Sequence, residues 1–175
     1  HIRVCRVADN MRNVAVTEGD KVEAQIRFGW EIDAYPVNEI AEAVQAVGKG
    51  DVDALVEEYY SKYQILLEGR DPEEFKKHVA VQAQIEIGFE RFLEEKNYQA
   101  IVTHFGDLGA LQQLPGLAIQ RLMEKGYGFG GEGDWKTAAM VRLMKIMTTG
   151  KKDAKGTSFM EDYTYNLVPG KEGIL

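Results

Sequence analysis

Two glutamates have the surroundings expected of a chemical site, because both lie among glycine, aromatic and small polar residues. Glu132 lies in GYGFGGEGDWKT (residues 126–137), and Glu161 lies in GTSFMEDYTY (residues 156–165). A glycine-rich turn has no structural need for glutamate, and a carboxylate among aromatic residues is costly unless it is paired or bound to metal. Paired carboxylates can hold a divalent cation and transfer protons. We therefore predict that Glu132 and Glu161 form one site.

Each glutamate also has a plainer interpretation. Glu132 precedes an expected helix, where an acid is favoured by the helix dipole. Glu161 alternates with Phe159 and Tyr163, as in a strand, and could be an exposed strand residue. The aromatic neighbours argue against full exposure of Glu161.

Other motifs add little to this site. The chain has three histidines, His1, His78 and His104, and no two have the spacing of metal ligands. His104 alone lies at the end of an expected central strand, where sheet enzymes place ligands, and the alternative that carries more weight is an ordinary buried core histidine. The glycines of Gly126-x-Gly128-x-x-Gly131 match a dinucleotide motif by spacing, but a helix is expected just before them, where that motif needs a strand.

Composition limits the class of protein. The 175 residues carry a net charge of −7 and one cysteine, Cys5. An acidic chain is a poor partner for nucleic acid or an anionic membrane, and one cysteine can form no internal disulfide. No apolar run is long enough to span a bilayer and no signal peptide is visible, so we expect a cytoplasmic protein. Because the chain starts directly in a strand-like run and stops just as another apolar run begins, we expect a piece of a longer polypeptide.

Helices and strands alternate along the chain, which favours an α/β fold: a three-layer Rossmann-like domain with a mainly parallel sheet. We predict strands at 2–7, 30–37 and 99–105, with 14–17 extending the sheet, and a short strand or turn at 127–131. We predict helices at 21–28, 72–96, 115–125 and 135–147, and two more that begin after caps at Asn38 and Asp51. The methionines at 140, 144 and 147 form a helical stripe that we assign to the core.

The expected domain boundary lies in a basic loop at 148–156. We assign residues 1–152 to the α/β domain, and residues 153–175 to the truncated start of a β-rich C-terminal domain, with a strand at 158–165.

Three segments resemble one known family. They are DNMRNVAVTEGDKVEAQIRFGW (residues 9–30), GYGFGGEGDWKTAAMVRLMKIM (126–147) and GTSFMEDYTYNL (156–167), and together they resemble L-arabinose isomerase. These are long, unusual matches in the expected order, and the resemblance covers essentially the whole chain as an internal piece. The family interconverts L-arabinose and L-ribulose, often converts D-galactose to D-tagatose, and uses Mn²⁺ or another divalent cation such as Co²⁺.

The resemblance implies roles for particular residues. Glu132 and Glu161 would be metal ligands and the acid/base pair, and Met11, Phe105 and Tyr163 would line the substrate pocket. The family's two metal-binding histidines come from later sequence, and Asn166 stands where many relatives carry histidine. The family forms trimers and hexamers with shared pockets, so we expect this chain to be inactive without the rest of its own polypeptide and sister subunits.

Two other functions remain open at this stage. The chain could be a non-catalytic α/β domain that binds a small ligand, either a sugar or a nucleotide, without metal. It could also be a structural or assembly domain whose glutamates matter only in the longer protein.

Overall fold

Four parallel strands form the centre of the molecule, in the order β2-β1-β3-β4. The computed structural model describes residues 1–152 and 156–159. The strands are β1 (Ile2–Val7), β2 (Trp30–Tyr35), β3 (Ala100–Val102) and β4 (Gly128–Gly130). The predicted α/β class with a mainly parallel sheet is confirmed.

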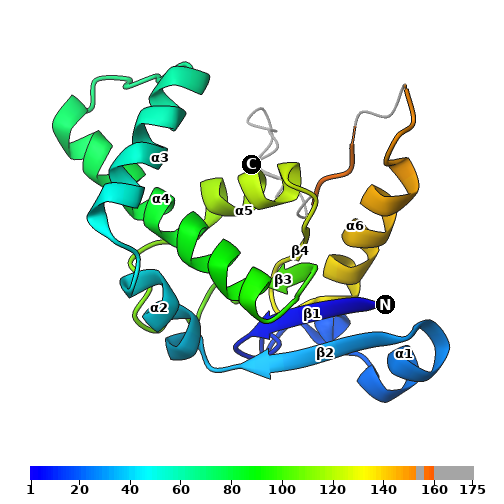
Figure 1. Ribbon diagram of the computed structural model, residues 1–175. Coiled ribbons are helices and arrows are strands. Elements are labelled where there is room, and N and C mark those ends of the chain that lie inside the picture. The colour runs from blue at the N-terminus through cyan, green and yellow to red at the C-terminus, as the bar shows by residue number, and fades with distance from the viewer. Residues whose placement is uncertain (153–155, 160–175) are drawn as a thin grey trace, which may run out of the picture.

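Helices connect the strands and cover both faces of the sheet (Figure 1). They are α1 (Lys21–Phe28), α2 (Val37–Gln45), α3 (Lys49–Lys62), α4 (Pro72–Glu95), α5 (Gly116–Glu124) and α6 (Trp135–Thr148). A short 3₁₀ helix, η1 (Ala15–Thr17), precedes α1. The longest helix, α4, begins as its sequence predicts: Asp71 accepts a hydrogen bond from the Glu74 amide at 2.8 Å, and Pro72 occupies the first turn.

The strands send alternate side chains to two separate cores. Cys5, Ile101 and Phe129 pack with α2, α4 and α5 on one face. Val4 and Val102 pack with α1 and α6 on the other. This alternation is the two-residue period of a strand, and it produces the three layers.

Glycine in β4 lets α6 lie directly on the strand. A β-carbon at Gly128 would lie 2.1 Å from the Ala138 carbonyl oxygen, and one at Gly130 would lie 2.3 Å from the Asp134 carbonyl oxygen. These glycines of the 126–131 segment therefore serve helix packing against the sheet.

Helix α3 and the first half of α4 project away from the sheet (Figure 1). They have an apolar cluster of their own, which includes Val52, Val56, Tyr59, Val79 and Ala83. We call this unit the helical arm.

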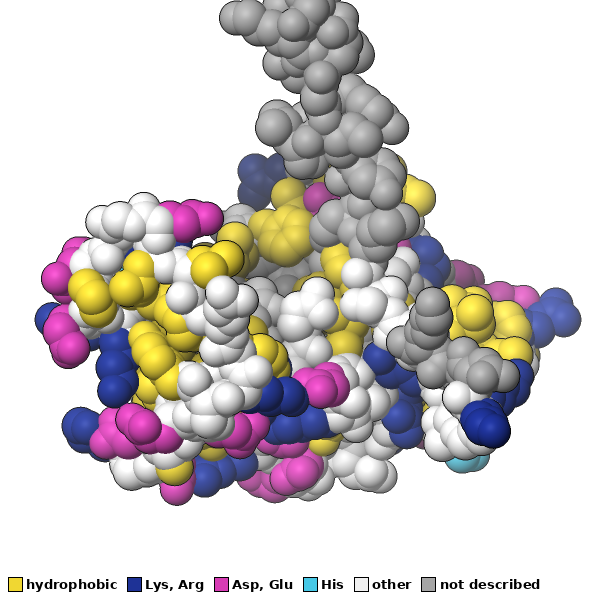
Figure 2. Space-filling model, turned by 90° about the horizontal axis from the view of Figure 1, so that it is seen from above, with side chains coloured by type: hydrophobic (Ala, Val, Ile, Leu, Met, Phe, Trp, Pro, Cys, Tyr) yellow, Lys and Arg dark blue, Asp and Glu magenta, His cyan; other side chains and the backbone are white. Residues whose placement is uncertain are grey.

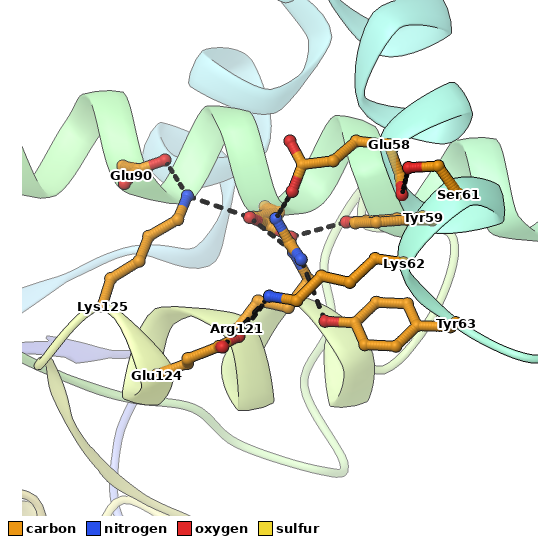
Figure 3. Close-up of polar contacts among 10 residues, drawn as sticks. Glu58, Tyr59, Ser61, Lys62, Tyr63, Glu90, Arg121, Glu124 and Lys125 are labelled. Carbon is orange, nitrogen blue, oxygen red and sulfur yellow. Dashed lines mark hydrogen bonds and ion pairs between the residues drawn. The ribbon is translucent and has the colours of Figure 1, made fainter.

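A buried ionic network joins the helical arm to α5 (Figure 3). Glu86 of α4 is fully buried, and both its carboxylate oxygens accept from Arg121 Nε, at 3.0 and 2.8 Å. Arg121 also donates to the Tyr63 hydroxyl at 2.9 Å and to Glu58 at 2.6 Å. Burial, followed by its hydrogen bond to Glu86, raises the pKa of Tyr59, so the phenol stays protonated as the donor. One arginine thus fixes the positions of three helices.

Three local predictions were wrong. Residues 15–17 form η1 and do not extend the sheet. Helix α2 starts at Val37 directly after Pro36, so Asn38 is inside the helix. Helix α3 starts at Lys49 after Gly48, so Asp51 is a first-turn acid and not the cap. The caps were misplaced because a polar residue near a helix start suits either position.

The methionine stripe was assigned to the wrong environment. Met140, Met144 and Met147 are 48%, 42% and 55% exposed, because α6 packs on the sheet through Trp135, Ala138 and Ala139. Small residues permit a close approach to the sheet, and the stripe is left on the outer face. Figure 2 shows apolar side chains reaching the surface on the side of the molecule where α6 lies.

Candidate functional site

Three loops meet at the carboxyl ends of the strands. They are residues 8–12 after β1, 103–106 after β3, and 131–134 after β4. The chain leaves β1 through α1 on one face, and it returns from β2 to β3 through α2, α3 and α4, with α2 and α4 packed on the other face. The gap between β1 and β3 is therefore the point where the direction of winding reverses. In open parallel sheets, ligands bind outside the carboxyl ends of the strands at this point.

Glu132 lies at this edge in a conformation unusual for glutamate. Its φ is 56°, in the left-handed region, and its side chain is half-buried. Its carbonyl oxygen accepts a hydrogen bond from the Met11 amide at 3.0 Å. Between the described residues, no hydrogen bond or salt bridge engages its carboxylate. A left-handed non-glycine residue costs free energy, and such residues cluster at functional sites.

The Glu132 turn is tied to both neighbouring loops. The Gly133 amide donates to the Thr103 carbonyl oxygen at 3.1 Å, and the Gly133 carbonyl oxygen accepts from Asn10 Nδ2 at 3.2 Å. A β-carbon at Gly133 would lie 2.6 Å from both Asn10 Cα and the Asp9 carbonyl oxygen. The loops therefore leave no room for a side chain at position 133.

An apolar cavity of about 250 Å³ opens next to this edge, between the end of β3 and α5. Its lining includes Thr103, Phe105, Met123, Phe129 and Phe159. Phe129 and Phe159 meet edge to face, with ring centroids 5.0 Å apart. The Thr103 hydroxyl is buried, and within the described part of the chain it has no hydrogen-bond partner. The contact with Phe129 places Phe159 on the face of the sheet that carries this cavity. In the sequence, Phe159 lies two positions before Glu161.

His104 has a defined local role at the edge. Its Nδ1 accepts a hydrogen bond from the Gly106 amide at 3.0 Å, and its ring is half-buried. The imidazole thus shapes the loop after β3.

Comparison with known proteins identifies the family. Residues 3–150 match the model of the L-arabinose isomerase central domain. The chain is 53% identical over 175 residues to an L-arabinose isomerase of Geobacillus thermodenitrificans, covering 100% of this chain and 34% of the relative. It is also 53% identical over 174 residues to the Yersinia enterocolitica enzyme of the same name, covering 99% of this chain and 34% of the relative.

The chain belongs to the L-arabinose isomerase family. It spans about a third of the length of the curated relatives it matches. The predicted resemblance to L-arabinose isomerase is thereby confirmed, while the division at residue 152 stays a prediction.

The fold brings together some of the predicted site residues of this L-arabinose isomerase family member. Met11 contacts the Glu132 backbone directly, and Phe105 follows β3 at the same edge of the sheet, with 37% of its surface exposed. Glu161 and Tyr163 lie outside the described residues.

Sequence reasoning missed Arg6, Asn10 and Thr103. Asn10 lies in the polar segment 8–13, where Met11 was the only residue assigned to the site. The signal that could have identified this segment is its position directly after a buried strand. Polar residues at the carboxyl edge of a sheet can contact a ligand, or they can hold in place the loops that contact it.

One group at this edge, the Glu132 carboxylate, is of the kind that binds a divalent cation. Glu132 offers a carboxylate with no partner among the described residues, and hard oxygen ligands suit Mn²⁺. In the described part of the chain, no three histidine, cysteine, aspartate or glutamate residues are close enough to form a complete site. Among the described residues, the Glu132 carboxylate is therefore available as a single ligand and does not by itself complete a metal site.

Within residues 1–152 and 156–159, no helix has the length and hydropathy needed to cross a membrane.

Proposed function

We propose that the full-length protein containing this chain is a metal-dependent aldose–ketose isomerase that converts L-arabinose to L-ribulose, and also D-galactose to D-tagatose. Membership of the L-arabinose isomerase family supports the reaction class. The observation that carries the proposal for this chain is the position of Glu132, beside Met11 at the carboxyl edge where the winding of the sheet reverses.

The chemistry requires two groups that move protons. Isomerisation transfers a proton between C1 and C2 of the sugar through an enediol. Glu132 and Glu161 divide this work: one carboxylate takes the carbon-bound proton, and the other serves the hydroxyl proton. Met11, Phe105 and Tyr163 line the sugar pocket and exclude water from the reacting carbons.

The cofactor is Mn²⁺ or another divalent cation such as Co²⁺, with Glu132 and Glu161 among its ligands. When bound, the cation supplies electrostatic stabilisation of the negative charge that develops on the sugar oxygens.

The rest of the polypeptide completes the site and covers part of this domain. Val22, Ile26 and Phe28 on α1 are 66%, 72% and 65% exposed, on the same layer as the exposed methionines of α6. Apolar side chains gathered on one layer mark a contact surface, and the matched relatives are about three times as long as this chain. The remainder of the same polypeptide is the occupant. The full protein assembles with sister subunits in the cytoplasm.

The test is ketose production from L-arabinose by the full-length protein, measured with Mn²⁺ and with EDTA. We expect turnover with Mn²⁺ that disappears in EDTA. Absence of turnover on every pentose and hexose aldose, with or without added metal, would replace the proposal with the non-catalytic small-ligand domain.

The Glu132→Gln variant of the full-length protein tests the role given to Glu132. General acid–base groups contribute roughly 10²- to 10⁴-fold to rate, so we expect a loss of at least about 10²-fold with unchanged circular dichroism. Near-normal turnover would refute the role. The 175-residue chain alone should form no more ketose than the same chain carrying Glu132→Gln.

A further inference from the structure

The peptide unit between Glu132 and Gly133 is held at both ends. The Glu132 carbonyl oxygen accepts from Met11, and the Gly133 amide donates to Thr103. Because these bonds fix the peptide plane, they also restrict the direction in which the Glu132 side chain leaves the backbone. The bonds come from the loops after β1 and β3, so the aim of the carboxylate depends on how those loops are held.

Asn10 is the centre of the contact between the β1 loop and the Glu132 turn. Its side chain is buried, and both hydrogens of Nδ2 are used: one on the Thr17 carbonyl oxygen and one on the Gly133 carbonyl oxygen, 3.2 Å away. Its Oδ1 accepts from Arg6 Nη1. An asparagine is suited to this position because it accepts at one end and donates twice at the other.

Arg6 orients Asn10 from the end of β1. The guanidinium group is buried, and it also pairs with Asp9 at 2.8 Å. Fixing Oδ1 against Arg6 leaves the amide hydrogens of Asn10 facing the two carbonyl groups. Burial makes the arrangement demanding, because each of these groups would lose a partner in a dry environment if Asn10 were removed.

We propose that Asn10, oriented by Arg6, is a positioning residue that aims the Glu132 carboxylate at the reacting sugar and the cation. This inference rests on the proposed isomerase function. Asn10 touches neither substrate nor metal: it acts through the Gly133 carbonyl and through the adjacent Met11 amide. Residues that orient a metal ligand typically change metal affinity or activity by about 10- to 100-fold when they are replaced.

The deciding variant is Asn10→Asp in the full-length protein. Aspartate has nearly the same shape and keeps the contact with Arg6, but it cannot donate to the Thr17 and Gly133 carbonyl groups. Asn10→Ser is the second variant, for use if a buried carboxylate prevents folding. Arg6→Lys tests the orienting contact, because lysine keeps the charge and loses the planar guanidinium group.

The matched control is Asp71→Ala, which removes the N-cap of α4 far from the site and lowers stability without touching the carboxyl edge. For each protein we would measure kcat and KM for L-arabinose, the Kd of Mn²⁺ by calorimetry in the absence of sugar, and the thermal unfolding midpoint.

We expect Asn10→Asp or Asn10→Ser to lower kcat by about 10- to 100-fold and to weaken Mn²⁺ binding by a similar factor. The KM for sugar should change less than kcat, and Asp71→Ala should lower only the unfolding midpoint. The inference is overturned if both Asn10 variants lower the midpoint while kcat and the Mn²⁺ Kd stay equal to those of Asp71→Ala.

The Glu132→Gln variant distinguishes a failure of the proposed function from a failure of the positioning role. If Glu132→Gln remains active, the assignment of Glu132 itself is wrong. If Glu132→Gln is inactive while the Asn10 variants keep full activity and Mn²⁺ affinity, only the positioning role is wrong.

Discussion

Glu132 is one of four described non-glycine residues with positive φ, together with Ala8, Glu68 and Asn97. The left-handed conformation costs an L-residue with a β-carbon roughly 1–2 kcal/mol, and glycine is free of this cost. Glycine lies on both sides of it in the sequence, so glycine at position 132 would satisfy the backbone better. A glutamate kept in this conformation is consistent with a role for its carboxylate.

We therefore expect Glu132→Gly to raise the free energy of unfolding of the chain by about 0.5–1 kcal/mol, because the relief of strain exceeds the added flexibility of the unfolded chain. In the full-length protein the same change should abolish turnover. Glu68→Gly is the matched control, since Glu68 has a φ of 51° and lies in an exposed loop. Glu68→Gly should give a similar rise in the free energy of unfolding, measured with urea, and it should leave turnover unchanged. A clear loss of stability in Glu132→Gly alone would mean that the carboxylate makes a stabilising contact.

At the scale of elements, the closeness of the β1 loop to the Glu132 turn can be tested with two glycines of similar conformation. Gly133 and Gly69 have φ values of 81° and 85°, but a β-carbon would clash only at Gly133. We expect Gly69→Ala to cost about 1 kcal/mol from backbone strain, and Gly133→Ala to cost about 1–3 kcal/mol more from steric overlap with Asn10 and Asp9. Urea unfolding of the two variants measures the difference. Equal costs would show that the loops can separate at little expense.

The buried network between the helical arm and α5 gives the second test at this scale. Arg121→Met removes the main partner of the fully buried Glu86. Breaking a buried pair typically costs about 3–5 kcal/mol, and we expect the lower end because Lys125 and Tyr59 still contact Glu86. Chemical unfolding measures the loss.

The control for the network is Lys62→Met, which breaks the solvent-exposed pair between Lys62 and Glu124. It should leave the unfolding curve nearly unchanged, because water screens this pair and solvates the glutamate that remains. Similar effects of Arg121→Met and Lys62→Met would show that the arm is held by its apolar cluster alone.

For the whole molecule, the exposed apolar side chains of α1 and α6 should behave differently in the chain and in the full-length protein. Ile26→Lys and Met144→Lys replace side chains that are 72% and 42% exposed here. We expect no change in the thermal midpoint of the 175-residue chain, and a lower midpoint in the full-length protein, where the charge would be buried.

The control for this surface is Gln45→Lys, at the exposed end of α2 on the opposite side of the sheet. It should be tolerated in both proteins. Tolerance of Ile26→Lys and Met144→Lys in the full-length protein would show that the remainder of the polypeptide does not cover this face.

The sequence by itself was sufficient for the fold class, most helices and strands, and Glu132 as a candidate residue. These features depend on short-range patterns: a two-residue alternation in strands, apolar spacing and a cap at Asp71 in α4, and an acid out of place among glycines. The same patterns could not decide whether Asn38 and Asp51 are N-cap residues or first-turn residues, because polar side chains are favoured at both positions.

Only the tertiary structure decided which apolar stripe lies against the sheet and which loops hold the site. The α6 methionines have the spacing of a core face, but Ala138 and Ala139 let the opposite face approach the sheet more closely. Asn10 and Gly133 are 123 positions apart, and no local pattern links them. Their contact exists because parallel strands bring their carboxyl ends to one edge, where residues from distant loops must satisfy one another's buried hydrogen-bonding groups.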